Sequence, residues 1–433
     1  MNDDLSVTAE DRRTLRELAK RVRDIAALPV MEERRRLWKR HNSLRPERPM
    51  ILVFPEGSWR ELLADADMRC EGERARRIEW NLRRRLYYHE NLRDDTVIEG
   101  HYTVHTVTHS TGWGLSPRHT DSTEERGAWA FDPVVHEPED LKKLHHPEIT
   151  RDDEATRREL EFHRDLLGDI LEVRHKGVDH ISFHPASQYC RLRGLAEVMM
   201  DMAADPEFVH EAMRILTDGH RRRIEQYVEL DLLDLNNDGT YHSSGGVGYT
   251  DELPQDDFDG ETVRPCDMWA SAESQEMAQV SPDMHAEFVM AYESELLEPF
   301  GLNGYGCCEP LTGGKLEHVF DLPNMRRISI SPFADVEEAA EKLKNDYIYS
   351  WKPHPAHLCG EFNAERIRRY IRHALEVADA HGCLFEMVLK DTHTCDHRPE
   401  RFTRWTEIAR EEVRRISGVE EGELRGAELE SLG

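Results

Sequence analysis

Short apolar runs alternate with amphipathic stretches along most of the chain, and the alternation is most regular over the last 130 residues. Runs rich in β-branched and aromatic residues predict strands, and apolar positions spaced three and four apart predict helices. The predicted strands cover residues 50–54, 94–109, 180–185, 232–239, 302–310, 325–332, 347–353 and 383–391. The predicted helices cover residues 1–45, 73–92, 195–228, 281–301, 315–323, 335–344, 363–382 and 399–416.

Capping residues support several of these helix boundaries. Asn363 precedes one helix and Gly382 follows it, as N-cap and C-terminal signals require. Asp335 and Glu338 have the spacing of a capping box. Asp205-Pro206 predicts a break within residues 195–228.

Strands that alternate with helices of 10–20 residues indicate a parallel sheet. Eight such units over this length predict an α/β fold of the (β/α)8 TIM-barrel type. A doubly wound open sheet is the alternative, but the stretch FPEGSW after the first strand is not a glycine-rich phosphate loop. We expect an N-terminal helical extension over residues 1–45, a barrel over 46–418, and a flexible acidic tail over 419–433.

Charge and hydropathy narrow the range of partners. The chain of 433 residues carries 57 Lys and Arg against 86 Asp and Glu, a net charge of −29, which disfavours nucleic acid and anionic membrane surfaces. No run of eighteen apolar residues predicts a membrane span, and the first 24 residues lack the apolar core of a secretory signal. We therefore expect a cytoplasmic protein that acts on a small molecule.

In a barrel the active site lies at the C-terminal ends of the strands, where this sequence places many reactive side chains. We predict catalytic roles for His242, His393 and Lys390, although for His242 a purely structural role fits the sequence at least as well. The predicted substrate-binding residues are Glu56, Asp238, Tyr241, Tyr249 and His354. The glycines of residues 238–254 suggest either a loop that covers the substrate or an ordinary surface loop.

The stretch YGCCEPLTGG places Cys307, Cys308 and Glu309 on successive positions. If the strand continues through them, Cys307 and Glu309 share a face and Cys308 points to the other. Thiolate, imidazole and carboxylate groups are zinc ligands, so these residues and Cys395 predict a metal site with one open position. The alternatives are a vicinal disulfide, which a reducing compartment disfavours, and small residues packed in the core.

Several stretches resemble the uroporphyrinogen decarboxylase superfamily, in particular its methyltransferase-like branch, from about residue 49 to residue 416. They are PEGSW, DDTVIEG, YGCCEPL, RRISISPFADVEEAAEKL, YIYSWKPHPAHL, LKDTHT and PERFTRWTEIAREE. The resemblance implies a (β/α)8 barrel. It also implies one of two activities: tetrapyrrole decarboxylation without a cofactor, or zinc-dependent methyl transfer involving a corrinoid protein.

The sequence departs from both branches. The decarboxylases carry an Arg-Gln-Ala-Gly-Arg loop near the first strand, where this chain has FPEGSWREL, so the arginines that hold substrate carboxylates are missing. The methyltransferases carry His-x-Cys on a late strand and another Cys after the last strand. Cys307 and Cys395 match these thiols, but Tyr305 replaces the histidine. The predicted third ligand is therefore Glu309, with His393 and His242 as alternatives.

We expect a zinc-dependent methyltransferase that acts with a corrinoid protein, either in demethylation of a small methylated substrate or in methyl transfer to a thiol. The alternatives are a cofactor-independent decarboxylase acting on another acid and an inactive ligand-binding barrel. The resemblance is also compatible with a homodimer, because related barrels often pair.

Overall fold

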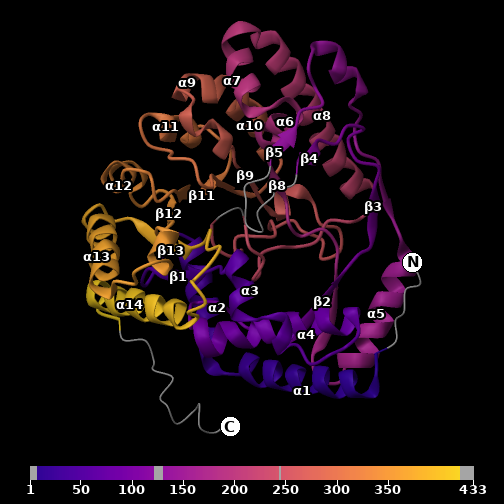
Figure 1. Ribbon diagram of the computed structural model, residues 1–433, viewed down its shortest axis with the longest axis vertical. Helices are drawn as coiled ribbons and strands as arrows, with labels where there is room; N and C mark the ends of the chain where they lie inside the picture. Colours follow the sequence, from indigo (N-terminus) through magenta and orange to yellow (C-terminus); the bar gives the residue numbers. More distant parts are fainter. Residues whose placement is uncertain (1–6, 121–129, 243–244, 420–433) are drawn as a thin grey trace. The chain divides into compact units, whose positions relative to one another are not determined.

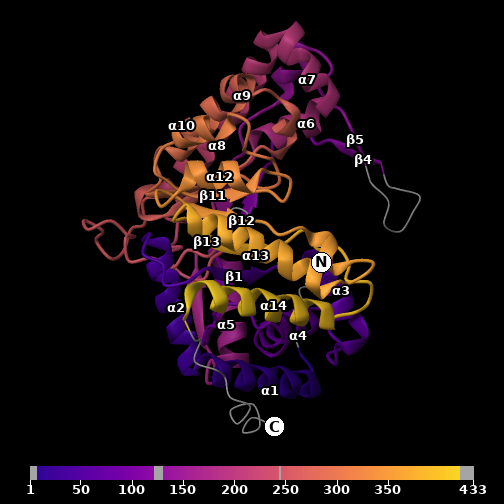
Figure 2. The ribbon, with the colours of Figure 1, turned by 90° about the vertical axis from the view of Figure 1, so that its left-hand side faces the viewer.

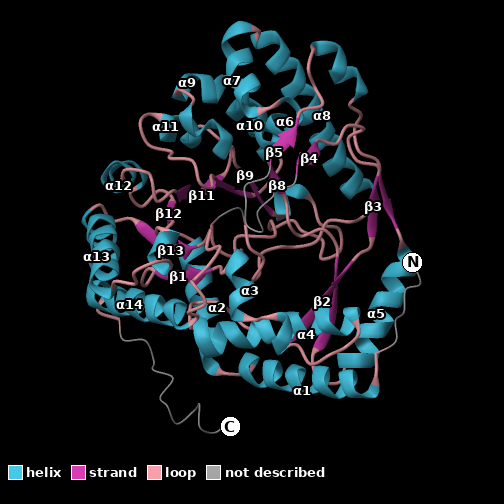
Figure 3. Cartoon of the chain, viewed as in Figure 1, coloured by secondary structure: helices cyan, strands magenta, loops and turns pink. Residues whose placement is uncertain are grey.

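The computed structural model describes residues 7–120, 130–242 and 245–419, which form two compact units. Unit 1 comprises Met1–Tyr102, Phe162–Arg174 and Leu343–Gly433, and unit 2 comprises Thr103–Glu161 and His175–Lys342. The chain passes between the units within β2 (His101–His105), α5 (Asp153–Leu167), β7 (Glu172–Lys176) and α12 (Val336–Leu343). Helices and short strands alternate in both units (Figures 1 and 3).

Unit 1 contains both the first and the last strand of the described chain. Its remaining helices are α1 (Ala9–Ala26), α2 (Pro29–Asn42), α3 (Trp59–Leu62), α4 (Glu73–Tyr87), α13 (Ala364–Ala380) and α14 (Glu400–Ser417). Its parallel strands are β1 (Met50–Val53), β12 (Ile348–Trp351) and β13 (Leu384–Leu389), in the order β1-β13-β12. The first and last strands are therefore neighbours, as closure of a barrel requires.

The amphipathic helices of unit 1 pack on one another through their apolar faces. Thr8 caps α1 by accepting the N–H of Asp11, and the buried stripe of α1 lies against α4 (Figure 1). Leu15 and Val22 of α1 share this core with Ile78 and Leu82 of α4. α13, capped by Asn363, and α14 lie side by side (Figure 2), and Glu412 of α14 binds Arg368 and Arg372 of α13.

Unit 2 contains a second parallel ladder with its own helices. The ladder has the order β11-β10-β9-β8, formed by β8 (Ser182–Phe183), β9 (Trp269–Ala272), β10 (Leu302–Tyr305) and β11 (Met325–Ile330). The helices are α6 (Pro185–Arg193), α7 (Leu195–Ala204), α8 (Pro206–Glu229), α9 (Pro282–His285), α10 (Ala291–Leu297) and α11 (Lys315–Phe320). Two small antiparallel pairs join β3 (Thr108–Ser110) to β6 (Ile149–Arg151) and β4 (Arg118–Thr120) to β5 (Ala130–Asp132).

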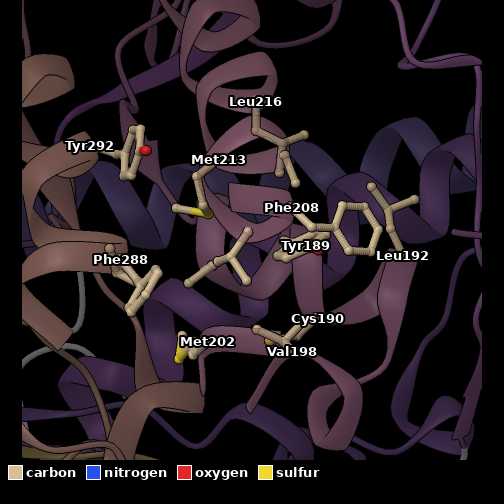
Figure 4. Packing of buried hydrophobic residues seen from close by; sticks show 14 of the residues in the cluster. Tyr189, Cys190, Leu192, Val198, Met202, Phe208, Met213, Leu216, Phe288 and Tyr292 are labelled. Atoms are coloured by element: carbon tan, nitrogen blue, oxygen red, sulfur yellow. The ribbon is translucent and has the colours of Figure 1, made fainter. Parts of the chain in front are cut away.

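A large apolar cluster lies among α6, α7, α8 and α10 of unit 2. Figure 4 shows Tyr189, Phe208, Met213 and Leu216 at its centre, with Phe288 at one side. Burial of each such side chain stabilises the fold by roughly 1.5–3 kcal/mol. This packing holds α6, α7, α8 and α10 together.

The structure confirms an α/β fold of alternating parallel strands and helices. Neither ladder closes on itself within the described residues, so the predicted barrel is not confirmed. Helices occupy residues 9–26 and 29–42 of the predicted extension. The boundary at residue 45 remains a prediction, and the predicted tail lies outside the described residues, apart from Val419.

Two strand predictions were wrong in detail. Residues 94–100 do not form a strand; the carboxylate of Asp95 accepts the N–H of Ile51, and that of Asp94 accepts the N–H of Val53. Residues 232–239 form no strand, because Leu233 makes only an isolated parallel bridge with Val178. Side-chain hydrogen bonds replace the predicted strand pairing at Asp94 and Asp95, and a single bridge replaces it at Leu233.

Candidate functional site

Three neighbouring strands of unit 2 end at the same level. Phe183 pairs with Ala272, which pairs with Tyr305. The residues that follow are His184, Glu273 and Gly306. Parallel strands lie about 4.8 Å apart, so these positions are adjacent at the C-terminal edge of the ladder.

The thiol loop, residues 306–309, begins where β10 ends. Gly306 has φ +90°, a left-handed conformation that terminates the strand, so strand alternation does not apply to the residues after it. The Sγ atoms of Cys307 and Cys308 are 3.3 Å apart. A disulfide bond would be about 2.05 Å long, so this is a contact between two thiols. Cys307 is buried and Cys308 is half-buried.

Glu309 holds the thiol loop from inside. Its carboxylate accepts the N–H of Cys307 at 3.0 Å and that of Ser274, which follows β9, at 3.3 Å. The side chain is fully buried. Burial and, after it, the charge of Glu273 raise the pKa of Glu309 above its ordinary value. Glu309 thus ties together the loops that follow β9 and β10.

A buried polar network supports Ser274. Its Oγ lies 2.6 Å from Nε2 of His285 and 2.8 Å from the hydroxyl of Tyr305, which donates to Glu293 at 2.8 Å. Burial lowers the pKa of His285 to about 3 and raises that of Glu293 well above 4.5. His285 is therefore a neutral imidazole near pH 7, and the hydrogen bonds of the network fix the position of Ser274.

His184 and Glu273 form a pair that the sequence analysis missed. Nδ1 of His184 lies 2.8 Å from Glu273 Oε1, and its Nε2 lies 2.9 Å from Ser182 Oγ. Glu273 was missed because β9, with the short sequence WASA, has no alternation that predicts a strand. The polar alternation His180, Ser182, His184 was the available signal for His184.

The ends of β1 and β13 are joined in unit 1. Thr392 donates through Oγ1 to the carbonyls of Phe54 and Pro55, and the hydroxyl of Ser58 donates to the carbonyl of Thr392. Glu56 and Asp391 adopt left-handed backbone conformations, with φ +45° and +57°. Non-glycine residues in this region concentrate at functional sites.

Glu56 lies near Lys390, Asp391 and His393. Partial desolvation raises the pKa of Glu56, Lys390 opposes this rise, and Asp391 adds to it. Lys390 is buried, with Nζ 3.6 Å from Asp391 Oδ1, whereas His393 is exposed. Three predicted site residues, Glu56, Lys390 and His393, thus come together in unit 1, and their roles remain predictions.

Cys395 also lies in unit 1, where Glu61 holds it. Its thiol donates to Glu61 Oε2 at 3.2 Å, and Glu61 also accepts the N–H groups of Cys395 and His397 and the hydroxyl of Thr394. Burial and Glu61 raise the pKa of Cys395 to about 11, so the group is a neutral thiol near pH 7. Ionisation of Cys395 for metal binding would require the Glu61 bond to break.

Changing Glu61 to Gln is therefore expected to make Cys395 more acidic. The variant removes the carboxylate that disfavours the thiolate, so alkylation by iodoacetamide at pH 8.5 should accelerate several-fold. Mass spectrometry of the peptide that contains Cys395 measures this rate. Cys383, whose pKa burial raises to about 11, serves as the internal reference. An unchanged rate would contradict this account of the thiol.

The remaining predicted site residues have structural contacts. His354 accepts the N–H of Ala356 through Nδ1 and so caps a short 3₁₀ turn. Asp238 binds Lys176 at 2.7 Å and the hydroxyl of Thr240. The carbonyl of Tyr241 lies 3.1 Å from His180 Nδ1.

His242 and Tyr249 are buried in unit 2. His242 donates from Nε2 to the carbonyl of Asn236 and stacks on Trp269, and burial lowers its pKa to about 3. The hydroxyl of Tyr249 lies beside Gly239, in the space that a side chain at that position would occupy. These contacts match the structural alternative for His242, and its catalytic role remains a prediction.

The predicted metal ligands thus fall into two groups, Cys307, Cys308 and Glu309 in unit 2 and Cys395 in unit 1. Within residues 7–120, 130–242 and 245–419, no group of three or more His, Cys, Asp or Glu side chains is arranged to hold a metal ion. The shared ion therefore remains a prediction.

Comparisons with known proteins find similarity in structure but not in sequence. No protein-family model matches the chain, and no curated protein matches it. The fold resembles that of a methyltransferase from Methanosarcina mazei with a TM-score of 0.48 and 12% sequence identity, over 87% of this chain and 98% of that chain. Among the described helices, none combines the length and the apolar character needed to cross a bilayer.

Proposed function

We propose that the protein is a zinc-dependent methyltransferase that works with a corrinoid protein and uses the thiol loop as its metal-binding element. The observation that carries the proposal is the pair of thiols, Cys307 and Cys308, held 3.3 Å apart at the C-terminal end of β10. The sequence resemblance to the methyltransferase-like branch of the uroporphyrinogen decarboxylase superfamily supplies the reaction class.

The donor set fits zinc in part. Two thiolates on a tetrahedral zinc ion, each about 2.3 Å from it, lie about 3.8 Å apart. The observed 3.3 Å therefore needs only a small side-chain movement. Glu309 is already held by two backbone N–H groups, and Cys395 by Glu61, so the described structure supplies two soft donors and not a complete ligand set.

The thiol loop has the properties that a thiolate ligand pair needs. Glu309 fixes the backbone of Cys307, so little rotational freedom is lost when the pair binds an ion. Cys308 is half-buried, which leaves it accessible from solvent. When bound, zinc ionises a thiol or polarises the heteroatom that carries a methyl group.

Removal and return of zinc test this proposal. Protein purified from zinc-supplemented cells is expected to contain about one zinc per chain by mass spectrometry. It should demethylate methylcobalamin in the presence of a small thiol such as 2-mercaptoethanol, measured by the change in corrinoid absorbance. Chelation should abolish this activity, and zinc but not magnesium should restore it.

Protein that takes up no zinc would contradict the proposal. Activity on a carboxylic acid that survives chelation would favour the decarboxylase alternative, and ligand binding without turnover would favour an inactive barrel.

A further inference from the structure

Ser182, His184 and Glu273 form a continuous hydrogen-bonded chain, here called the Ser-His-Glu relay. Ser182 Oγ lies 2.9 Å from His184 Nε2, and His184 Nδ1 lies 2.8 Å from Glu273 Oε1. Ser271 donates its hydroxyl to Ser182 at 3.0 Å, so Ser182 can direct its own proton to His184. In such a chain the carboxylate orients the imidazole, and the imidazole can then accept the proton of the hydroxyl.

The relay differs from an ordinary surface ion pair in its burial. The side chain of His184 is 40% exposed, whereas that of Glu273 is 14% exposed. A shielded carboxylate that holds Nδ1 fixes the tautomer and leaves Nε2 as the acceptor. His184 precedes α6 but makes no capping hydrogen bond with its side chain, so helix capping does not explain it.

The relay lies at the same edge of the ladder as the thiol loop. His184 and Glu273 directly follow the paired residues Phe183 and Ala272, and Gly306 follows Tyr305 on the next strand. The N–H of Gly306 also donates to the carbonyl of Ala272. The charge of Glu273 acts on Glu309, which places the two groups in one electrostatic environment.

We propose that this relay removes the proton of the protic group, thiol or hydroxyl, that accepts the methyl group; this inference rests on the proposed methyl transfer. As the acceptor's S–H or O–H bond breaks, its proton passes to Ser182 Oγ while the hydroxyl proton of Ser182 passes to His184 Nε2. The freed electron pair bonds to the methyl carbon, whose bond to the donor breaks and leaves its electrons there. Glu273 stabilises the imidazolium, which returns the proton to solvent.

Removal of the imidazole should slow methyl transfer without removing the metal. General acid-base catalysis contributes about 10²–10⁴-fold, so His184→Ala should lower kcat by at least about 100-fold, with bound zinc unchanged. Exogenous imidazole should restore part of the rate to His184→Ala but not to Ser182→Ala, because it replaces only the ring. His318→Ala is the control. The side chain of His318, on α11, is 31% exposed, and its Nε2 lies 3.4 Å from Asp283 Oδ1, so it is likewise a partly exposed histidine beside a carboxylate.

Full kcat in His184→Ala, or no restoration by imidazole, would overturn the relay. Covalent labelling of Ser182 by a fluorophosphonate would show that Ser182 is a nucleophile. That result would likewise overturn its assignment as a proton carrier. If zinc-loaded wild-type protein shows no methyl transfer at all, the proposed function fails instead.

A readout independent of activity then decides whether the relay exists. In ¹⁵N-histidine spectra, with His184 assigned from the His184→Ala variant, the wild type should show a single tautomer protonated at Nδ1. Glu273→Ala, which removes the acceptor of the Nδ1 proton, should abolish that preference. Spectra that are identical in wild type and Glu273→Ala would overturn the relay.

Discussion

Changing Cys307 and Cys308 together to Ser is expected to remove bound zinc and to lower methyl transfer by more than about 100-fold. The loss of residues that only support metal ligands already costs 10–100-fold in affinity or activity, and the loss of two ligands must cost more. Serine keeps the size of each side chain, and the backbone bonds from Cys307 and Ser274 to Glu309 do not involve sulfur. Zinc content and corrinoid absorbance measure the result.

Cys190 provides the matched control. It has the same 7% exposure as Cys307 and also lies in unit 2, but it packs within the apolar cluster of Figure 4. Cys190→Ser should lower stability and leave zinc content unchanged. Equal zinc loss in the two variants would indicate general unfolding, and full activity in the double variant would refute the proposed role of the thiol loop.

Changing Asp95 to Asn is expected to lower the free energy of unfolding by about 3–5 kcal/mol, the cost of leaving a buried ion partner unpaired. Asp95 accepts two hydrogen bonds from Arg48, both 2.8 Å long, and lies 3.1 Å from Arg410. The side chains of Arg48 and Asp95 are 4% and 1% exposed. The loss of the carboxylate charge therefore leaves a buried guanidinium uncompensated. Urea denaturation at pH 7 measures the change.

The neighbouring Asp94 provides a control of the same residue type and burial. Burial raises its pKa to about 6, and it accepts N–H groups from Val53 and Thr96 without an arginine hydrogen bond. Its ionisation therefore opposes folding at pH 7, and Asp94→Asn should cost much less than Asp95→Asn. Equal losses would show that the arginine pairing of Asp95 is not what stabilises unit 1.

The two aspartates also have opposite pH dependence. The arginines hold the pKa of Asp95 well below its ordinary value, so its contribution is present above about pH 4 and is lost as the pH falls. Asp94 has a raised pKa, so its contribution to the free energy of unfolding is present at low pH. That contribution is lost as the pH rises through about 6. Asp95→Asn should accordingly flatten the acid side of the stability profile.

Where local pattern and packing agree, the sequence predicted the elements correctly. α13 has its Asn363 cap, α8 begins at Pro206 after the predicted break, and β11, β12 and β13 lie within their predicted ranges. The prediction failed for β9, because Trp269–Ala272 is short and consists largely of small residues, and its strand conformation depends on pairing with β8 and β10.

The sequence by itself determined which side chains could do chemistry: two adjacent thiols with a carboxylate, and acidic and basic groups after predicted strands. Only the tertiary structure decided their partners. The strand end at Gly306 brought Cys307 and Cys308 together, Glu61 engaged Cys395, and strand register placed His184 beside Glu273. The spacing of apolar residues indicates whether a segment is a helix or a strand. It does not specify the register between strands, and the hydrogen bonds between loops that are distant in the chain depend on that register.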